Sequence, residues 1–427
     1  MIKIIFLTFL LKASIESILK FQFLTDSEKY DGKIPLIEYL SNNNIYIEFP
    51  VGTPKKLIPT YISLNQFTYY ITGKNLSGIY NEAASSSYHK MNDKETSFYQ
   101  DNFEKGYISQ ENIYLTNLEN KEIEISKFTF VLPSKEGKKI FPSLIGLGID
   151  SYYTKETGFI YQLKQKEIIK SYGWTIKYLD KYKGEIIFGG YPHEYDNNYD
   201  ESKFKNAKAE NRGNYIYWDL SFNSIKWNTF FFNYTNFTNL LIAELNINSG
   251  TIIAPGFFKK IFWDNLFNNN NCESIFHENK FYYFVCNNDF KMKNFGSLFF
   301  YNKDFEYSFE INYKDLFYEH EKKIYFLIFF SSSEYDRWTL GKPFFKNYQI
   351  IFEPDRKLIG FYNGKSFKFL TFSWIIVYIL GIIIILLGSY MIYKYKKLPI
   401  RIKAKELDDN EIYDSYKKID GKTTLGI

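Results

Sequence analysis

The residues that could do chemistry lie in two short segments, at residue 63 and at residues 248–251. In the second, Asn248–Thr251 joins one short apolar strand to another. Gly250 lets the backbone turn tightly, and the hydroxyls of Ser249 and Thr251 can bond to neighbouring groups. Neither an amide nor a hydroxyl titrates near neutral pH, so these side chains supply no general acid or base by themselves.

Ser63 is the residue of the first segment, and a serine hydroxyl can act as a nucleophile. A serine nucleophile needs a base within hydrogen-bond reach. The chain has four histidines, and none of them sits in a motif that would place it beside this serine; they are His89, His193, His277 and His320. We therefore do not expect serine-type chemistry. Nor does the sequence contain a recognisable metal-binding, redox or phosphate-binding motif, so we expect no cofactor and no metal.

Composition points to a globular protein with more than one domain. The chain has 427 residues, of which 45% are hydrophobic and 24% charged, which suits two compact domains with additions. The net charge of +5 is concentrated in a run of lysines and arginines between residues 394 and 405. Because this excess is local, we expect no nucleic-acid partner.

Two apolar segments predict the topology. Residues 1–19 carry a lysine, an apolar stretch and then small residues, which indicates a signal peptide; a buried first strand is the alternative. Residues 372–393 are apolar, uncharged and long enough to cross a bilayer as a helix. The basic run follows at once, so residues 394–427 should form a short cytoplasmic tail. We expect a single-pass protein of the secretory pathway or cell-surface membrane, with its N-terminal bulk luminal or extracellular.

The luminal part would then hold both cysteines and three glycosylation sequons. Cys272 and Cys286 are expected to form a disulfide, with two buried thiols as the alternative. The sequons begin at Asn75, Asn233 and Asn236, and each could carry a glycan if it is exposed, although such tripeptides also arise by chance.

The Asn248 segment resembles the second-lobe active-site loop of pepsin-like aspartic proteases, apolar-Asp-Ser/Thr-Gly-Thr/Ser, with Asn248 at the aspartate position. Residues 51–54, Val-Gly-Thr-Pro, resemble the turn before the family's first loop. By that spacing Ser63 takes the first aspartate position. Leu64 and Asn65 then stand where the family has threonine and glycine, and no acidic residue between positions 55 and 79 can restore the match.

Further segments follow the family's order. Residues 98–108 resemble the flap hairpin, with Tyr99 at the flap tyrosine position, although Tyr99 could be one aromatic among many. Residues 140–148 and 184–190 resemble the family's Leu-Gly-Leu-Gly and Phe-Gly-Gly segments. The strongest resemblance is Trp338–Phe361, where Lys342 replaces a usual aspartate and is expected to be a solvated or paired surface lysine.

The resemblance implies an all-β, bilobal pepsin-like fold with a central cleft, its lobes at residues 20–190 and 191–365. Alternating apolar residues and Gly/Asn turns also favour an all-β protein. Individual elements expected from the pattern include strands over 34–38 and 215–220 and helices over 158–169 and 256–266.

The family's reaction needs two carboxylates that share one proton. With Ser63 and Asn248 at those positions, we expect a membrane-anchored, catalytically inactive homologue that binds a peptide or protein in its cleft. Two alternatives remain: an active aspartic endopeptidase with an unusual site, and a structural or adhesive surface protein.

Overall fold

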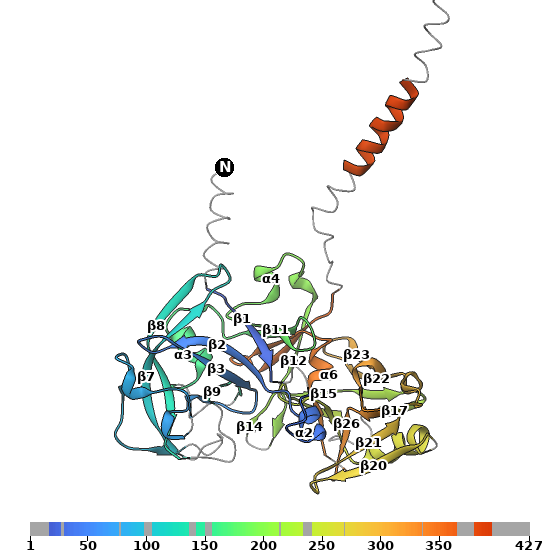
Figure 1. The fold of residues 1–427 in the computed structure, drawn as a ribbon, viewed down its shortest axis with the longest axis horizontal. Coiled ribbons are helices and arrows are strands. Elements are labelled where there is room, and N and C mark those ends of the chain that lie inside the picture. Colours follow the sequence, from blue (N-terminus) through green and yellow to red (C-terminus); the bar gives the residue numbers. More distant parts are fainter. Residues whose placement is uncertain are drawn as a thin grey trace, which may run out of the picture. The chain divides into compact units, whose positions relative to one another are not determined.

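The structure of the chain is a computed structural model. It describes residues 17–26, 30–76, 78–97, 105–135, 142–149, 156–212, 215–233, 241–268, 270–334, 336–364 and 380–394. The chain divides into two units, Met1–Lys365 and Ser366–Ile427. The first unit holds every strand of the described residues, and Figure 1 shows how they gather into two bodies of sheet.

The first half of the chain builds one part of a 14-stranded sheet. Its strands alternate between buried and exposed side chains, as β2 does with Ile45, Ile47 and Phe49 pointing inward. The elements of this half are β1 (Leu19–Thr25), α2 (Leu36–Ser41), β2 (Ile45–Val51), β3 (Lys56–Ser63), β4 (Tyr69–Ile71), η1 (Lys74–Leu76), η2 (Glu82–Ala84), β5 (His89–Lys90), β6 (Thr96–Ser97), β7 (Lys105–Thr116), β8 (Glu122–Pro133), β9 (Ser143–Gly146) and α3 (Phe159–Gln165).

The second half forms a nine-stranded and a four-stranded sheet with short helices beside them. Phenylalanine rings fill the space between these elements, so aromatic contacts dominate this core. The elements are β15 (Asp219–Ser221), β16 (Ser224–Trp227), β17 (Phe230–Asn233), β18 (Ile242–Leu245), β19 (Ile252–Ala254), α5 (Phe257–Phe262), η5 (Trp263–Phe267), β20 (Cys272–His277), β21 (Phe281–Asn287), η6 (Met292–Phe295), β22 (Ser297–Asn302), β23 (Tyr307–Asn312), η7 (Tyr313–Asp315), β24 (Phe317–His320), β25 (Lys323–Phe326), β26 (Ile328–Ser331), β27 (Trp338–Leu340) and α6 (Lys342–Phe345).

Strands from both halves meet towards one end of the large sheet. There the order β12-β29-β28-β10-β11-β1-β2 pairs β28, from the end of the unit, with β10, and β11 with β1. Trp174 and Phe352 stack with ring centroids 4.1 Å apart, and Trp218 meets Phe352 edge-on. The remaining elements are β10 (Trp174–Tyr178), β11 (Lys183–Phe188), α4 (Pro192–Tyr195), η3 (Glu201–Lys203), β12 (Phe204–Lys208), β13 (Asn211–Arg212), β14 (Tyr215–Ile216), β28 (Ile350–Glu353) and β29 (Leu358–Tyr362).

The two halves repeat one topology. In the first, β3 runs parallel to β9, β9 pairs antiparallel with β4, and β4 runs parallel to β8. In the second, β18 runs parallel to β27, β27 pairs antiparallel with β19, and β19 runs parallel to β26. The loops after β3 and β18, which begin at Leu64 and Asn246, are therefore equivalent, and internal duplication explains the two lobes.

Two of the element predictions need correction. The strand expected over residues 34–38 is wrong, because residues 36–41 form helix α2. Ile37 and Leu40 are both buried, a spacing of three that matches a helix and not a strand. The strand expected over residues 215–220 is split into β14 and β15 by Tyr217 and Trp218. Helices do form within 158–169 and 256–266, as α3 and as α5 with η5.

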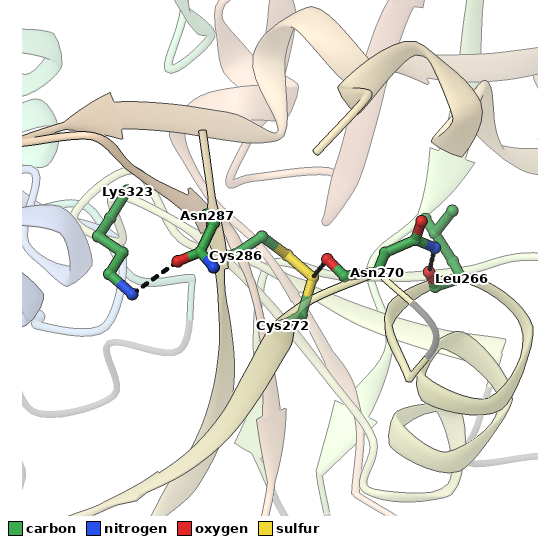
Figure 2. The surroundings of a disulfide bond; sticks show 6 residues. All are labelled: Leu266, Asn270, Cys272, Cys286, Asn287 and Lys323. Atoms are coloured by element: carbon green, nitrogen blue, oxygen red, sulfur yellow. Dashed lines mark hydrogen bonds between the residues drawn. A yellow bond between two sulfur atoms is a disulfide. The ribbon is translucent and has the colours of Figure 1, made fainter. Parts of the chain in front are cut away.

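The predicted disulfide is confirmed. Cys272 and Cys286 face each other across the β20–β21 ladder, with their Cα atoms 4.0 Å apart (Figure 2). Asn287 follows Cys286 and accepts a hydrogen bond from Lys323 Nζ at 2.9 Å, which ties the same strand to β25. Closing a loop of this length contributes about 3 kcal/mol by the chain-entropy argument.

The two predicted targeting segments lie wholly or partly outside the described residues. The structure describes the chain from residue 17 onward, and β1 begins at Leu19. In the second unit a helix covers residues 380–394. In the described parts of the chain, no helix combines the length and the apolar character that crossing a membrane requires.

Candidate functional site

Ser63 ends β3 at the point where this strand leaves the sheet. Its backbone carbonyl accepts a hydrogen bond from Leu147 N at 2.8 Å, and its hydroxyl accepts one from Asn65 N at 3.3 Å. Leu64, at the position where the resembled family has threonine, is only 2% exposed and packs into the core. The Ser63 hydroxyl therefore stabilises the turn that follows β3, through its bond from Asn65 N.

The equivalent loop of the other lobe is held by its own small side chains. The Asn248 backbone N–H donates to Asn246 Oδ1 at 3.0 Å, and Ser249 Oγ donates to the Thr251 carbonyl at 2.8 Å. At Gly250 a Cβ atom would lie 2.1 Å from the Leu40 carbonyl oxygen. Only glycine fits so close to another backbone, which explains the Ser-Gly-Thr pattern at this turn.

The structure brings the two predicted dyad positions together. Asn248 Nδ2 donates a hydrogen bond of 2.9 Å to the carbonyl of Ile62, the residue before Ser63. An ionised aspartate at position 248 would point an oxygen at this carbonyl and could only repel it. The amide thus makes a bond between the lobes that an ionised carboxylate cannot make.

Helix α2 and the residues after it clamp the Asn248 loop from another side. Gly250 N donates to the Ser41 carbonyl at 2.8 Å, and Asn43 N donates to the Asn248 carbonyl at 2.9 Å. The buried Asn43 side chain also donates to the Ile247 carbonyl at 2.7 Å. These bonds fix the backbone on both sides of Asn248.

A polar network that was not expected from the sequence lies beside the two loops. We call it the Asp219 network. Asn65 Nδ2 donates to Glu244 Oε1 at 2.8 Å, which links the Ser63 loop to β18. Arg212 Nη2 donates to the other Glu244 oxygen at 2.7 Å. The network consists of Asn65, Arg212, Asp219, Glu244 and Arg337.

Asp219 is the centre of this network. Its side chain is completely buried and receives two hydrogen bonds from Arg212, at 2.7 and 2.6 Å, and one from Arg337. Burial by itself would lower the pKa of Arg212, but the bonds to Asp219 and the charge of Glu244 outweigh it and raise that pKa. The two arginines of the network, Arg212 and Arg337, balance the charges of its two carboxylates, those of Asp219 and Glu244.

Sequence reasoning missed this network, although a signal was present. Glu244, Asn246 and Asn248 alternate along one strand and its extension, so their side chains share one face. Three polar residues on one face of an apolar strand indicate a polar environment there. What the sequence could not reveal is that Arg212 and Arg337 would reach this face from elsewhere in the chain.

No paired carboxylates occupy the two predicted dyad positions, Ser63 and Asn248. Within the described residues, neither Ser63 nor Asn248 exchanges a hydrogen bond with a carboxylate or with a histidine. Glu244 is the acidic side chain bonded to these loops, and Arg212 neutralises its charge. A single arginine-paired carboxylate cannot reproduce two close carboxylates that share a proton.

The other predicted site residues fall in different parts of the chain. Tyr99 lies outside the described residues, while the stem below it is described: Thr96 pairs with Gly106 in an antiparallel ladder. Asn75 and Asn233 are exposed, and Asn236 lies outside the described residues. These assignments remain predictions.

Comparison with known proteins gives the family and the fold. The sequence model of a family described as Eukaryotic aspartyl protease matches residues 64–363. The solved structure of conglutin gamma, a basic 7S globulin from lupine seeds, is similar with a TM-score of 0.59 and 14% identity. That of basic 7S globulin from soybean is similar with a TM-score of 0.58 and 14% identity. Each alignment covers 81% of this chain and 95% of the other.

The comparison with curated proteins found no match. The family match and the two solved structures confirm the mostly-β, bilobal, pepsin-like fold. The match begins at residue 64, directly after Ser63, so Ser63 at the first dyad position stays a prediction from spacing.

Proposed function

Because the chain belongs to the eukaryotic aspartyl protease family, we propose that it is a catalytically inactive member that acts by binding a peptide or protein. The fold supplies two lobes that resemble a substrate-binding scaffold. The reaction of the family requires an acid and a base at the dyad, and this chain has a serine and an amide there.

One observation supports the loss of activity most directly: the hydrogen bond from Asn248 Nδ2 to the Ile62 carbonyl. It uses the amide to join the two lobes at the place where catalysis would need a carboxylate. The bonds from Asn65 to Glu244 and from Trp218 Nε1 to the Leu147 carbonyl join the halves of the chain at the same level. This arrangement stabilises a fixed scaffold without a titratable pair.

The test of inactivity is an assay of the purified full-length protein. We expect no cleavage of a broad peptide library between pH 3 and 7, because no carboxylate pair is available to activate water. An active pepsin-like enzyme and a statine-type inhibitor serve as controls. Cleavage by the unmodified protein that the inhibitor abolishes would contradict the proposal and favour an active endopeptidase.

The binding role needs its own measurement. A peptide library passed over immobilised protein should leave a set of related sequences bound. Replacing Tyr99 with alanine should weaken their retention, because the resemblance places this residue on a flap over the cleft. Retention of no peptide would favour the structural or adhesive alternative, and equal retention by the variant would mean that Tyr99 does not contribute to binding.

We also propose that the protein is anchored in a membrane of the secretory pathway or cell surface by residues 372–393. Its N-terminal bulk would be luminal or extracellular, with glycans on exposed sequons such as those at Asn75 and Asn233. The proposal is supported by the apolar, uncharged run and the basic residues that follow it.

Protease treatment of sealed microsomes tests this orientation. An epitope tag after Lys394 should be digested while the bulk of the chain stays protected, because only the tail would face the outside. The bulk should become sensitive once detergent opens the vesicles. A protected tag together with a digested bulk would show the opposite orientation.

A further inference from the structure

A cavity of about 250 Å³ lies against the Asn248 loop, and we call it the Lys342 pocket. Gly250 forms part of its wall, together with side chains from helices α2 and α6, from the turn between β10 and β11, and from β24. The residues that matter for its chemistry are Tyr39, Lys181, Tyr182, Lys314, Tyr318 and Lys342.

Lys342 is the central cation of this pocket. It begins helix α6, and its backbone N–H donates to the Ser249 carbonyl at 2.8 Å, which fixes its position beside the loop. The side chain is half-buried, and its ammonium lies 5.6 Å from the centre of the Tyr182 ring. In the described part of the chain this ammonium has no hydrogen bond and no ion pair. Of the two expected states of this lysine, solvated or paired, the described residues show no pairing, and its side chain lies at the wall of a cavity.

The surrounding charges are mostly of the same sign. Lys181 lies over the rings of Tyr182 and Tyr318, at 5.1 and 5.3 Å, and Lys314 also lines the cavity. Lys346 is the exception, because it forms an ion pair with Asp315 at 2.6 Å. The pocket wall thus has four lysines and one aspartate.

Burial is the main cause that lowers the pKa of Lys342, to about 8, and the charges of Lys181 and Lys346 act in the same direction. Asp180 acts against them, but it is itself paired with Lys183. A half-buried cation without a counter-ion is less favourable than a solvated one unless something else compensates its charge. An anion in the cavity would do so.

We propose that the Lys342 pocket binds a small organic anion. Its carboxylate or phosphate group would contact Lys342, with Lys181 and Lys314 nearby, and its apolar part would lie among Tyr39, Tyr182 and Tyr318. The volume suits a ligand of about the size of a substituted benzene ring, and aromatic walls with a few placed cations are typical of such sites. This site is independent of the proposed peptide-binding function.

Calorimetric titration of the full-length protein in detergent tests the proposal with four probes: phenyl phosphate, benzoate, inorganic phosphate and phenol. We expect saturable one-to-one binding of phenyl phosphate, benzoate or both, and none of phenol. Phosphate should bind more weakly than phenyl phosphate, because it lacks the apolar part. The comparison of phenyl phosphate with benzoate shows which oxyanion the pocket prefers.

Substitutions decide whether this pocket is the site. Lys342→Met should weaken binding about tenfold or more, since it removes a charge-assisted hydrogen bond. Lys181→Met should weaken it to a smaller degree, and because Lys181 is exposed this variant also serves if Lys342→Met fails to fold. Lys260→Met, on an exposed lysine of α5, should leave binding unchanged.

Binding should also weaken as the pH rises through about 8, where Lys342 loses its proton. Tyr39 has its pKa raised to about 12 by burial and by neighbouring tyrosines, so it stays neutral in this range. Phenol binding as strong as that of the anions, binding that both lysine variants leave intact, or no saturable binding of any probe would overturn the proposal.

Discussion

Replacing Asp219 with alanine is expected to lower the free energy of unfolding by about 3–5 kcal/mol, the cost of removing one partner from a buried ion pair. The Asp219 side chain is completely buried between Arg212 and Arg337. Its removal leaves two largely desolvated guanidinium groups with Glu244 as the remaining carboxylate of the network. Chemical denaturation of the full-length protein, followed by tryptophan fluorescence, measures the loss.

Asp264→Ala is the matched control. Asp264 also pairs with a basic residue, Lys260, at 2.5 Å, but this pair lies on the exposed surface of the α5–η5 segment. Its removal should cost about 0.5 kcal/mol or less, as for other surface pairs. If Asp219→Ala destabilises the protein no more than Asp264→Ala, the network does not stabilise the fold in the way its geometry indicates.

The architecture could be predicted because its signals are local. The alternation of apolar residues in β2, the glycine at 250 and the cysteines at 272 and 286 each reflect constraints that neighbouring residues impose. Position 250 requires glycine because the Leu40 carbonyl oxygen lies where a Cβ atom would be. The sequence Asn-Ser-Gly-Thr by itself predicts a tight turn there. The disulfide was predictable because the chain has an even number of cysteines and both lie in the part expected to be luminal.

The features that escaped prediction depend on contacts between distant residues. The sequence of residues 34–38 predicts a strand, because a short apolar pattern fits either period, and the packing of helix α2 against the Asn248 loop decides between them. Asp219 occupies a strand whose neighbours are apolar, and its burial depends on arginines 7 and 118 residues away. The position of Lys342 within a matched motif suggested a surface residue, whereas it lines a cavity together with residues of helix α2 and of the β10–β11 turn.

Lys342→Met is expected to raise the free energy of unfolding at pH 7 in the absence of ligand. The pKa of Lys342 falls from 10.5 in the unfolded chain to about 8 in the folded one. The two pKa values differ by about 2.5, which at about 1.4 kcal/mol for each unit gives an upper limit of about 3.5 kcal/mol, and partial exposure reduces the expected gain to about 1–3 kcal/mol. Methionine fills a similar volume and needs no counter-ion.

The pH dependence separates this explanation from simple repacking. Below pH 8 both states carry the proton, so the folded wild-type protein bears the full cost of burying the charge. Between pH 8 and 10.5 the unfolded chain binds more protons than the folded one, so wild-type stability rises with pH relative to the variant. The advantage of Lys342→Met should therefore be largest below pH 8 and shrink towards pH 10.5, while the pocket tyrosines, common to both proteins, cancel in the difference. Lys260→Met, on an exposed lysine, should show no such trend.

A gain for Lys342→Met that is constant with pH would mean that the charge is not its cause. A loss of stability would mean that Lys342 already has a compensating partner when the pocket is empty. A stability gain at pH 7 combined with weakened anion binding would instead show that this lysine is kept at a cost to the fold, as expected of a residue that serves a ligand.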